Sequence, residues 1–144
     1  MVELHVERVI AAPQPAVFAW LADPGNLTTA PLAFRAGFCR GTCAPAVGAQ
    51  RWLVGAGIWV REEITAYDPP DSYSYRILRA IPAFDHRGGT LTFTPSGMGT
   101  HVDWRSSYTH PLYAGGAVTQ AITGPLLRSS FLAILGGCAN ALEQ

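Results

Sequence analysis

The sequence contains no lysine: all ten basic residues are arginine, and ten acidic residues balance them to a net charge of zero. Without lysine the chain cannot form a lysine Schiff base or supply the lysine of a phosphate-binding P-loop. A neutral chain also produces no overall field that draws it to nucleic acid or an anionic membrane, so we expect no nucleic-acid partner. The plentiful alanine, glycine, proline and arginine explain the missing lysine more simply by a GC-rich, bacterial genome.

Charged residues are scarce as well, at 14% of the chain against about 25% in typical globular domains. Hydrophobic residues make up 49% of the 144 positions, enough for one good core. No repeat, low-complexity tract or linker interrupts the sequence. We therefore expect residues 1–144 to form a single domain.

Cysteine is limited to three residues, Cys39, Cys43 and Cys138. The odd number, and an N-terminus without a signal-peptide pattern, predict free thiols in a cytoplasmic protein. No second Cys or His pair stands at zinc-ligand spacing, so we expect no metal. The glycines at 55 and 57 are not followed by a helix as a dinucleotide fingerprint requires, so we expect no cofactor.

Polar residues and glycines interrupt the longest apolar segment, residues 115–142, which therefore does not predict a membrane span. Leu127, Phe131, Ile134 and Cys138 recur at helical spacing within it and predict one long final helix with a buried stripe. Pro125 predicts a kink or a restart of that helix.

Period-two alternation predicts a first strand that ends near Ile10. Prolines and an apolar face then predict a short helix before residue 23, and a second helical turn over 25–30. Six further strands are expected at 33–42, 49–55, 57–67, 72–81, 88–95 and 100–109. This order predicts an α+β fold in which a curved seven-stranded antiparallel sheet wraps around the long C-terminal helix and leaves a cavity at one end.

Several segments carry a resemblance that covers nearly the whole chain: VERVIAAP (6–13), VFAWLADP (17–24), VREEIT (60–65) with DPP (68–70), YSYRI (73–77) and GTHVDW (99–104). They resemble the START-related helix-grip (SRPBCC) superfamily, and within it the bacterial polyketide cyclase/dehydrase and lipid-transport-like group. The resemblance implies a helix-grip fold with a deep, mostly apolar pocket for lipids, polyketides or other hydrophobic molecules. It does not imply catalysis, because the group includes carriers as well as cyclases.

Alternation in the last strand places Trp104, Ser106 and Tyr108 on one face, which we expect to line the cavity. The opposite face carries His101 and Asp103, which are more typical of a solvated convex surface than of a catalytic group. Hydroxyl groups on an apolar inner face can orient a ligand carbonyl or phenol.

Glu62 shares a strand face with Val60 and Ile64, so it points inward if they do. A buried carboxylate could move protons, or it could form an internal ion pair with Arg51 or Arg76; a different register would place it in water. An inward Arg51 could anchor a carboxylate or polarise a carbonyl, but the sequence does not settle which face it occupies. The inward faces of residues 33–42, 49–55 and 72–81 are equally open.

The first functional hypothesis is the carriage or sequestration of a hydrophobic small molecule. The expected ligand-binding residues are Phe34, Phe38, Arg51, Trp52, Val60, Glu62, Ile64, Tyr75, Phe93, Trp104, Ser106, Tyr108, Leu127 and Phe131. The alternative is an aromatase/cyclase or dehydratase, with Glu62, Tyr108 and Arg51 as catalytic candidates. A third hypothesis is an interaction module or homodimer, for which the stripe of Val118, Ile122 and Leu126 would be exposed.

Overall fold

The computed structural model describes residues 1–31, 33–39, 41 and 44–143. In chain order the elements are β1 (Val2–Ile10), α1 (Gln14–Ala22), the 3-10 helix η1 (Pro24–Thr29), β2 (Ala33–Phe38), β3 (Gln50–Gly55), β4 (Ile58–Asp68), β5 (Ser72–Ile81), β6 (Asp85–Ser96), β7 (Gly99–Thr109), the 3-10 helix η2 (Leu112–Ala114) and α2 (Gly116–Leu142).

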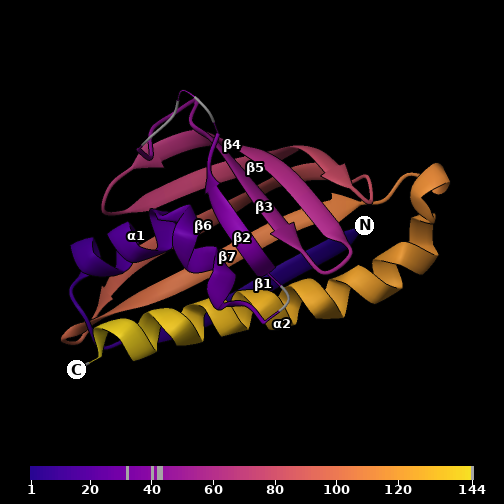
Figure 1. The fold of residues 1–144 in the computed structure, drawn as a ribbon. Coiled ribbons are helices and arrows are strands. Elements are labelled where there is room, and N and C mark those ends of the chain that lie inside the picture. The colour runs from indigo at the N-terminus through magenta and orange to yellow at the C-terminus, as the bar shows by residue number, and fades with distance from the viewer. Residues whose placement is uncertain (32, 40, 42–43, 144) are drawn as a thin grey trace.

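The described strands form one antiparallel sheet in the order β1-β7-β6-β5-β4-β3-β2. The sheet curves over α2, which crosses its concave side, while α1 and η1 lie near the C-terminal half of that helix (Figure 1). This is the expected helix-grip architecture. Two boundaries differ by more than one residue: β2 ends at Phe38 rather than at residue 42, and β6 begins at Asp85 rather than at residue 88. Residues 40, 42 and 43, and with them the expected thiol of Cys43, lie outside the described residues.

The core fills the end of the concave face that α1 covers. The ring of Phe18 packs against those of Tyr73 and Phe93, with centroid distances of 5.8 and 5.1 Å. The Tyr73 hydroxyl donates a hydrogen bond to the carbonyl of Leu21 over 2.9 Å, which ties β5 to α1. Because this end is closed by aromatic packing, the space that remains lies toward the other end of the sheet.

Helix α2 is long and apolar enough to cross a membrane by length and composition alone, with a mean hydropathy of 1.3 over 18 residues. Its C-terminal half instead packs into the domain core through Ile134, Leu135 and Cys138, which are buried. The helix continues through Pro125, so the expected restart does not occur. Close packing against η1 requires Gly137, because a Cβ there would lie 2.1 Å from Cγ2 of Thr29.

Candidate functional site

A cavity of about 130 Å³ lies between the concave face of the sheet and α2. Most of its wall is apolar, and the polar groups come from strands β3 to β7 and from α2. The lining residues are Leu27, Ala30, Ala33, Arg51, Leu53, Ile58, Val60, Glu62, Tyr73, Tyr75, Ile77, Phe84, His86, Trp104, Ser106, Tyr108, Leu127, Ser130, Phe131 and Ile134.

Most of the expected ligand-binding residues lie in this wall. They are Arg51, Val60, Glu62, Tyr75, Trp104, Ser106, Tyr108, Leu127 and Phe131. The alternation in β7, and in β4 as far as Ile64, therefore indicates the inward face correctly. It also places His101 and Asp103 on the outer face, as expected for a convex surface.

Five expected residues lie outside the wall. Trp52 follows Arg51 in β3 and so points to the other face, where its indole N–H donates to the Phe38 carbonyl over 3.2 Å. Phe34 is 61% exposed, because a register shift between Ala33 and Arg35 leaves only the alanine facing the cavity.

The other three of these residues lie elsewhere in the molecule. Ile64 and Phe93 are fully buried, but they belong to the packed interior rather than to the cavity wall. Phe38 lines a separate shallow depression beside α1 together with Phe18 and Tyr67. Strand alternation indicates the face of the sheet on which a side chain lies, but not whether an inward side chain lies beside the cavity or within the packed core.

An ion pair between Arg51 and Glu62 forms the most polar part of the wall. The two residues are directly opposite each other in β3 and β4, and Nη2 of Arg51 donates to Oε1 of Glu62. The arginine is only 2% exposed and lies against the rings of Tyr73 and Tyr75. Burial opposes its charge, but the Glu62 carboxylate together with Tyr73 and Tyr75 outweighs this and raises the pKa of Arg51 above its ordinary value.

Two donors of this guanidinium are unsatisfied. Within the described part of the chain, Nε and Nη1 of Arg51 are buried and have no hydrogen-bond partner. A buried donor left without a partner costs about 1–3 kcal/mol, so such groups are rare in native proteins. Both nitrogens belong to a side chain that lines the cavity, where a ligand acceptor could satisfy them.

A second polar pair joins His86 and Ser106. Nδ1 of the imidazole accepts the backbone N–H of Ile77 over 3.0 Å, so the neutral ring carries its proton on Nε2. That proton is donated to the Ser106 hydroxyl oxygen 2.9 Å away. Burial, aided by the charge of Arg76, lowers the pKa of His86 to about 4, so the ring is neutral at pH 7. His86 therefore acts as a donor to Ser106 and not as a base that activates it.

The sequence analysis did not identify His86, because the residue falls between the expected strands 72–81 and 88–95, whereas β6 begins at Asp85. A register shift between His86 and Gly88 forms a bulge in β6, with Gly88 at φ +127°. Without the bulge, His86 would lie on the opposite face from Leu91; the extra residue turns it inward. The adjacent glycines at positions 88 and 89 are the sequence feature that could have indicated this bulge.

The wall between these pairs is built from stacked rings. Trp104 stacks on Phe131 of α2 with a centroid distance of 4.0 Å, and its N–H donates to the Tyr75 hydroxyl over 3.0 Å. Tyr75 in turn stacks on His86 at 5.6 Å. Gly89 makes room for this arrangement, because a Cβ there would lie 2.3 Å from the Tyr75 ring. The rings are therefore held in place before any ligand arrives.

Tyr108 is held at the far end of the cavity by a hydrogen-bonded chain. His110 contacts the Ala83 carbonyl through Nδ1 at 2.7 Å, so its Nε2 accepts the Thr123 hydroxyl proton over 2.9 Å. Thr123 in turn accepts the proton of Tyr108 over 2.9 Å. The Tyr108 proton is thus directed to α2 rather than to the cavity.

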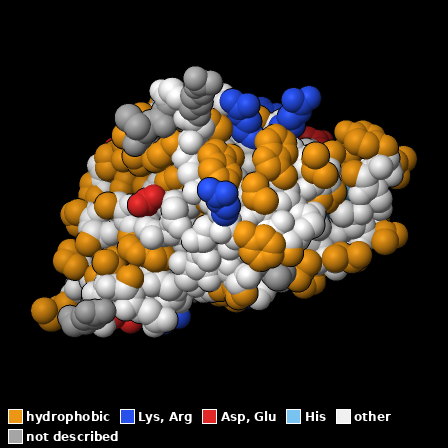
Figure 2. Space-filling view, viewed as in Figure 1, with side chains coloured by type: hydrophobic (Ala, Val, Ile, Leu, Met, Phe, Trp, Pro, Cys, Tyr) orange, Lys and Arg blue, Asp and Glu red, His pale blue; other side chains and the backbone are white. Residues whose placement is uncertain are grey.

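The remaining sequence hypothesis concerns the N-terminal half of α2. Val118, Ile122 and Leu126 are 71%, 59% and 47% exposed and form an apolar stripe beside the exposed Leu112 and Tyr113. Figure 2 shows hydrophobic side chains gathered at the end of the molecule where α2 begins. This exposure is the condition that the interaction-module hypothesis requires.

Solved structures share this fold over nearly the full chain. TTHA0849 from Thermus thermophilus is 20% identical, with a TM-score of 0.74 over 96% of this chain and 94% of its own. The major latex-like protein 151 of Panax ginseng is 12% identical, with a TM-score of 0.71 over 97% and 96%. DynU16, from the dynemicin biosynthetic locus, is 18% identical, with a TM-score of 0.70 over all of this chain and 48% of its own. At these identities the likeness concerns the fold alone.

A search among curated proteins finds no sequence match. The family model described as polyketide cyclase / dehydrase and lipid transport matches residues 1–144. The chain therefore belongs to the polyketide cyclase / dehydrase and lipid transport family.

Proposed function

We propose that the protein binds a small, uncharged, hydrophobic molecule that carries a carbonyl group, and that Arg51 donates a hydrogen bond to the carbonyl oxygen. The single observation that carries this proposal is the pair of buried, unsatisfied nitrogens of Arg51 beside an otherwise apolar cavity. Ser106 supports it, because its oxygen accepts from His86 and its own hydroxyl proton is left to donate, either to the neighbouring Tyr75 or to a ligand. The polar side of the cavity thus offers donors, and a matching ligand supplies an acceptor.

The charge of the wall favours a neutral ligand over an acid. Arg51 and Glu62 cancel each other, and His86 is neutral at pH 7. A bound carboxylate would leave one net negative charge in a buried apolar site, which is costly. A ketone, ester or amide oxygen accepts the same hydrogen bond without that charge.

The size of the cavity limits the ligand further. Its volume of about 130 Å³ is close to that of an engineered apolar cavity of about 150 Å³ that holds benzene. It is well below the range of about 300–1,000 Å³ common for drug-sized ligands. The cavity as it stands therefore fits a molecule with one aromatic ring, and a lipid or polyketide chain requires Phe131 and Leu127 of α2 to move outward.

The buried polar pairs favour an enzyme as the second candidate function. In that case Arg51 would polarise the bound carbonyl, and a cyclisation or dehydration would also need a base. Glu62 is the group that could accept a proton, and it would first have to leave Arg51. Because Tyr108 donates its proton to Thr123, it is not poised to protonate a ligand. This geometry provides orientation and polarisation more readily than proton transfer, which is why binding is the function we favour.

The proposal is tested by comparing three single-ring probes of similar size: acetophenone, ethylbenzene and benzoate. A hydrogen bond from a charged donor contributes about 1.5–3 kcal/mol, so acetophenone should bind roughly 10–100-fold more tightly than ethylbenzene. Benzoate should bind more weakly than acetophenone. Affinities are read from two-dimensional NMR titrations, whose shifts should centre on β3, β4 and β7.

The matched control is the double variant Arg51→Met/Glu62→Leu, which replaces the ion pair with apolar side chains of similar size. It should bind acetophenone and ethylbenzene equally well. A wild-type protein that does not prefer the ketone, or a double variant that keeps the preference, would contradict the role of Arg51.

Interaction through α2 remains the third function to test, because its apolar stripe is exposed. Sedimentation of the wild type and of Ile122→Asp distinguishes a homodimer from a monomer. A dimer that the aspartate dissociates supports the hypothesis, and a monomer at high concentration contradicts a homodimer.

A further inference from the structure

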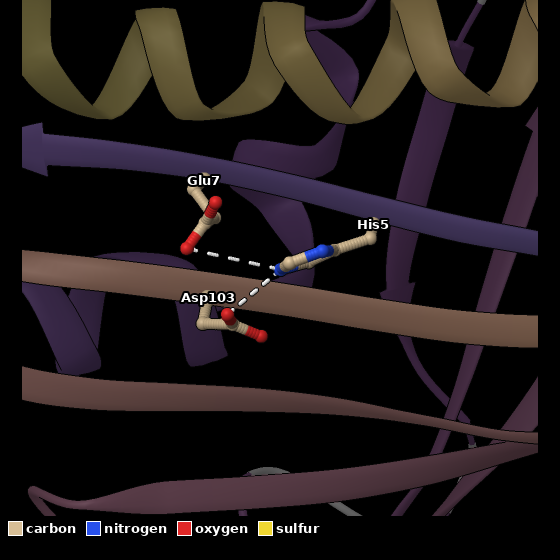
Figure 3. Close-up of side chains that lie close together, drawn as sticks. All are labelled: His5, Glu7 and Asp103. Carbon is tan, nitrogen blue, oxygen red and sulfur yellow. Dashed lines mark hydrogen bonds and ion pairs between the residues drawn. The ribbon is translucent and has the colours of Figure 1, made fainter.

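The convex face of the sheet carries a cluster that the cavity does not use. His5 and Glu7 of β1 and Asp103 of β7 point toward one another there (Figure 3). One ligand atom from each lies within 4.8 Å of the other two. Nε2 of His5 is 2.8 Å from Oδ2 of Asp103 and 3.8 Å from Oε1 of Glu7.

The strand register brings two like charges face to face. Glu7 and Asp103 are direct partners in the antiparallel pairing of β1 with β7. Carboxylates directly opposite each other destabilise a sheet unless something offsets their repulsion. His5 and His101 flank the pair on opposite diagonals, and Nε2 of His101 lies 3.2 Å from Oε1 of Glu7.

We propose that His5, Glu7 and Asp103 form a binding site for a divalent transition-metal ion such as Zn²⁺, with His101 as the nearest further ligand. Tetrahedral zinc holds N and O ligands at about 2.0–2.1 Å, which sets the ligand atoms about 3.3 Å apart. Within the triad, Nε2 of His5 lies 2.8 Å from Asp103 and 3.8 Å from Glu7, on either side of that value, and His101 contacts only Glu7 at 3.2 Å. Imidazole with carboxylate selects zinc, copper or nickel over magnesium and calcium, which prefer oxygen ligands alone.

The neighbours of the cluster support this role. The second oxygen of Asp103, Oδ1, accepts from Nε of Arg105 over 3.0 Å, so Oδ2 is directed toward His5. Partners of this kind orient ligands in metal sites. On binding, the ion takes the place of the Nε2 proton of His5 and the neutral ring carries its proton on Nδ1. Two carboxylates and a divalent ion then sum to zero charge, and the guanidinium of Arg105 adds one positive charge beside them.

The spacing of Cys and His residues along the sequence does not reveal this arrangement. Such spacing identifies only ligands that are close in sequence, whereas His5 and Asp103 are 98 positions apart and meet through strand pairing. The site lies on the opposite face from the cavity, so it is independent of the proposed ligand function.

The experiment is a calorimetric titration of the full chain with ZnCl₂ at pH 7.5, in a Cys39→Ser/Cys43→Ser background that removes competing thiols. In this background, the protein with His5, Glu7 and Asp103 unchanged should bind one zinc ion per chain with micromolar affinity. Single changes His5→Gln and Glu7→Gln should each weaken binding about tenfold or more. The matched control Glu3→Gln removes a carboxylate from the same strand outside the cluster and should leave the affinity unchanged.

A second readout locates the ion. NMR signals of His5, Glu7 and Asp103 should shift on zinc addition, with circular dichroism confirming that each variant is folded. Zinc binding that is absent, that survives both ligand substitutions, or that shifts other residues instead would overturn the proposal.

Discussion

The ion pair of Arg51 with Glu62 allows a stability prediction with a worked magnitude. In Glu62→Gln the guanidinium stays buried without an anion, and breaking a buried pair in this way costs about 3–5 kcal/mol. The Glu62 side chain is still 12% exposed, so we take the lower end, about 3 kcal/mol. For a domain of this size that loss lowers Tm by about 10 °C.

The apolar double variant Arg51→Met/Glu62→Leu should behave differently. It removes both charges together, and it also removes the two unsatisfied nitrogens of Arg51. Its stability should lie within about 1 kcal/mol of wild type or above it, as when other buried pairs are replaced by apolar residues.

Urea unfolding followed by tryptophan fluorescence measures all three proteins. A double variant that loses as much stability as Glu62→Gln, or a single variant that loses none, would refute the argument that the pair is buried and mutually dependent. The same double variant is the control for ligand binding, so its stability also decides whether the binding comparison is sound.

Three further predictions concern other parts of the fold. Gly137→Ala should lower the free energy of unfolding by about 1–3 kcal/mol, because its Cβ would overlap Thr29. The control Gly136→Ala, whose Cβ meets only ordinary contacts, should be neutral or stabilising in urea unfolding. Equal effects of the two substitutions would contradict the tight packing of α2 on η1. The pKa of His86 is lowered to about 4 in the folded chain, so as the pH falls below the ordinary histidine pKa the unfolded chain takes up a proton before the folded chain does. Between pH 7 and pH 5 the free energy of unfolding of wild type should therefore fall by about 2 kcal/mol more than that of His86→Gln. If both proteins lose the same amount, the imidazole is not buried in its neutral form. Phe131→Ala should destabilise by about 3 kcal/mol, the lower end for such a truncation because the ring is only partly buried, yet it should bind the two-ring ketone 2-acetylnaphthalene more tightly than wild type by NMR titration. Unchanged affinity would show that this ring does not limit the cavity.

Much of the site follows from strand alternation, and the exceptions have physical causes. The inward face of β7 follows from alternation, and so does that of β4 as far as Ile64, where Val60 and Ile64 are buried and Glu62 lies on their side; beyond Ile64 a bulge brings Tyr67 to the core in place of Ala66. In β3 both faces are mixed, so alternation alone could not choose between Arg51 and Trp52. The register with β4 decides the matter, since it sets Arg51 opposite Glu62. That register follows from the two-residue turn at 56–57, where Gly57 has φ +70° and Gly55 pairs with Ile58.

Bulges set a second limit on what alternation can predict. His86 faces the cavity only because an extra residue at Gly88 reverses the parity of β6, and Phe34 faces outward through a similar shift in β2. A glycine makes a bulge possible but does not require one. The size of the cavity depends on the Trp104–Phe131 stack, which joins two elements distant in sequence.

The most direct test of the central claim is a crystal structure of the protein with acetophenone. The account requires the ring to lie in the cavity between the sheet and α2, with the carbonyl oxygen about 3 Å from Nε or Nη1 of Arg51. A ketone bound with its oxygen away from Arg51, or bound outside the cavity, would contradict the proposal that this arginine recognises the ligand.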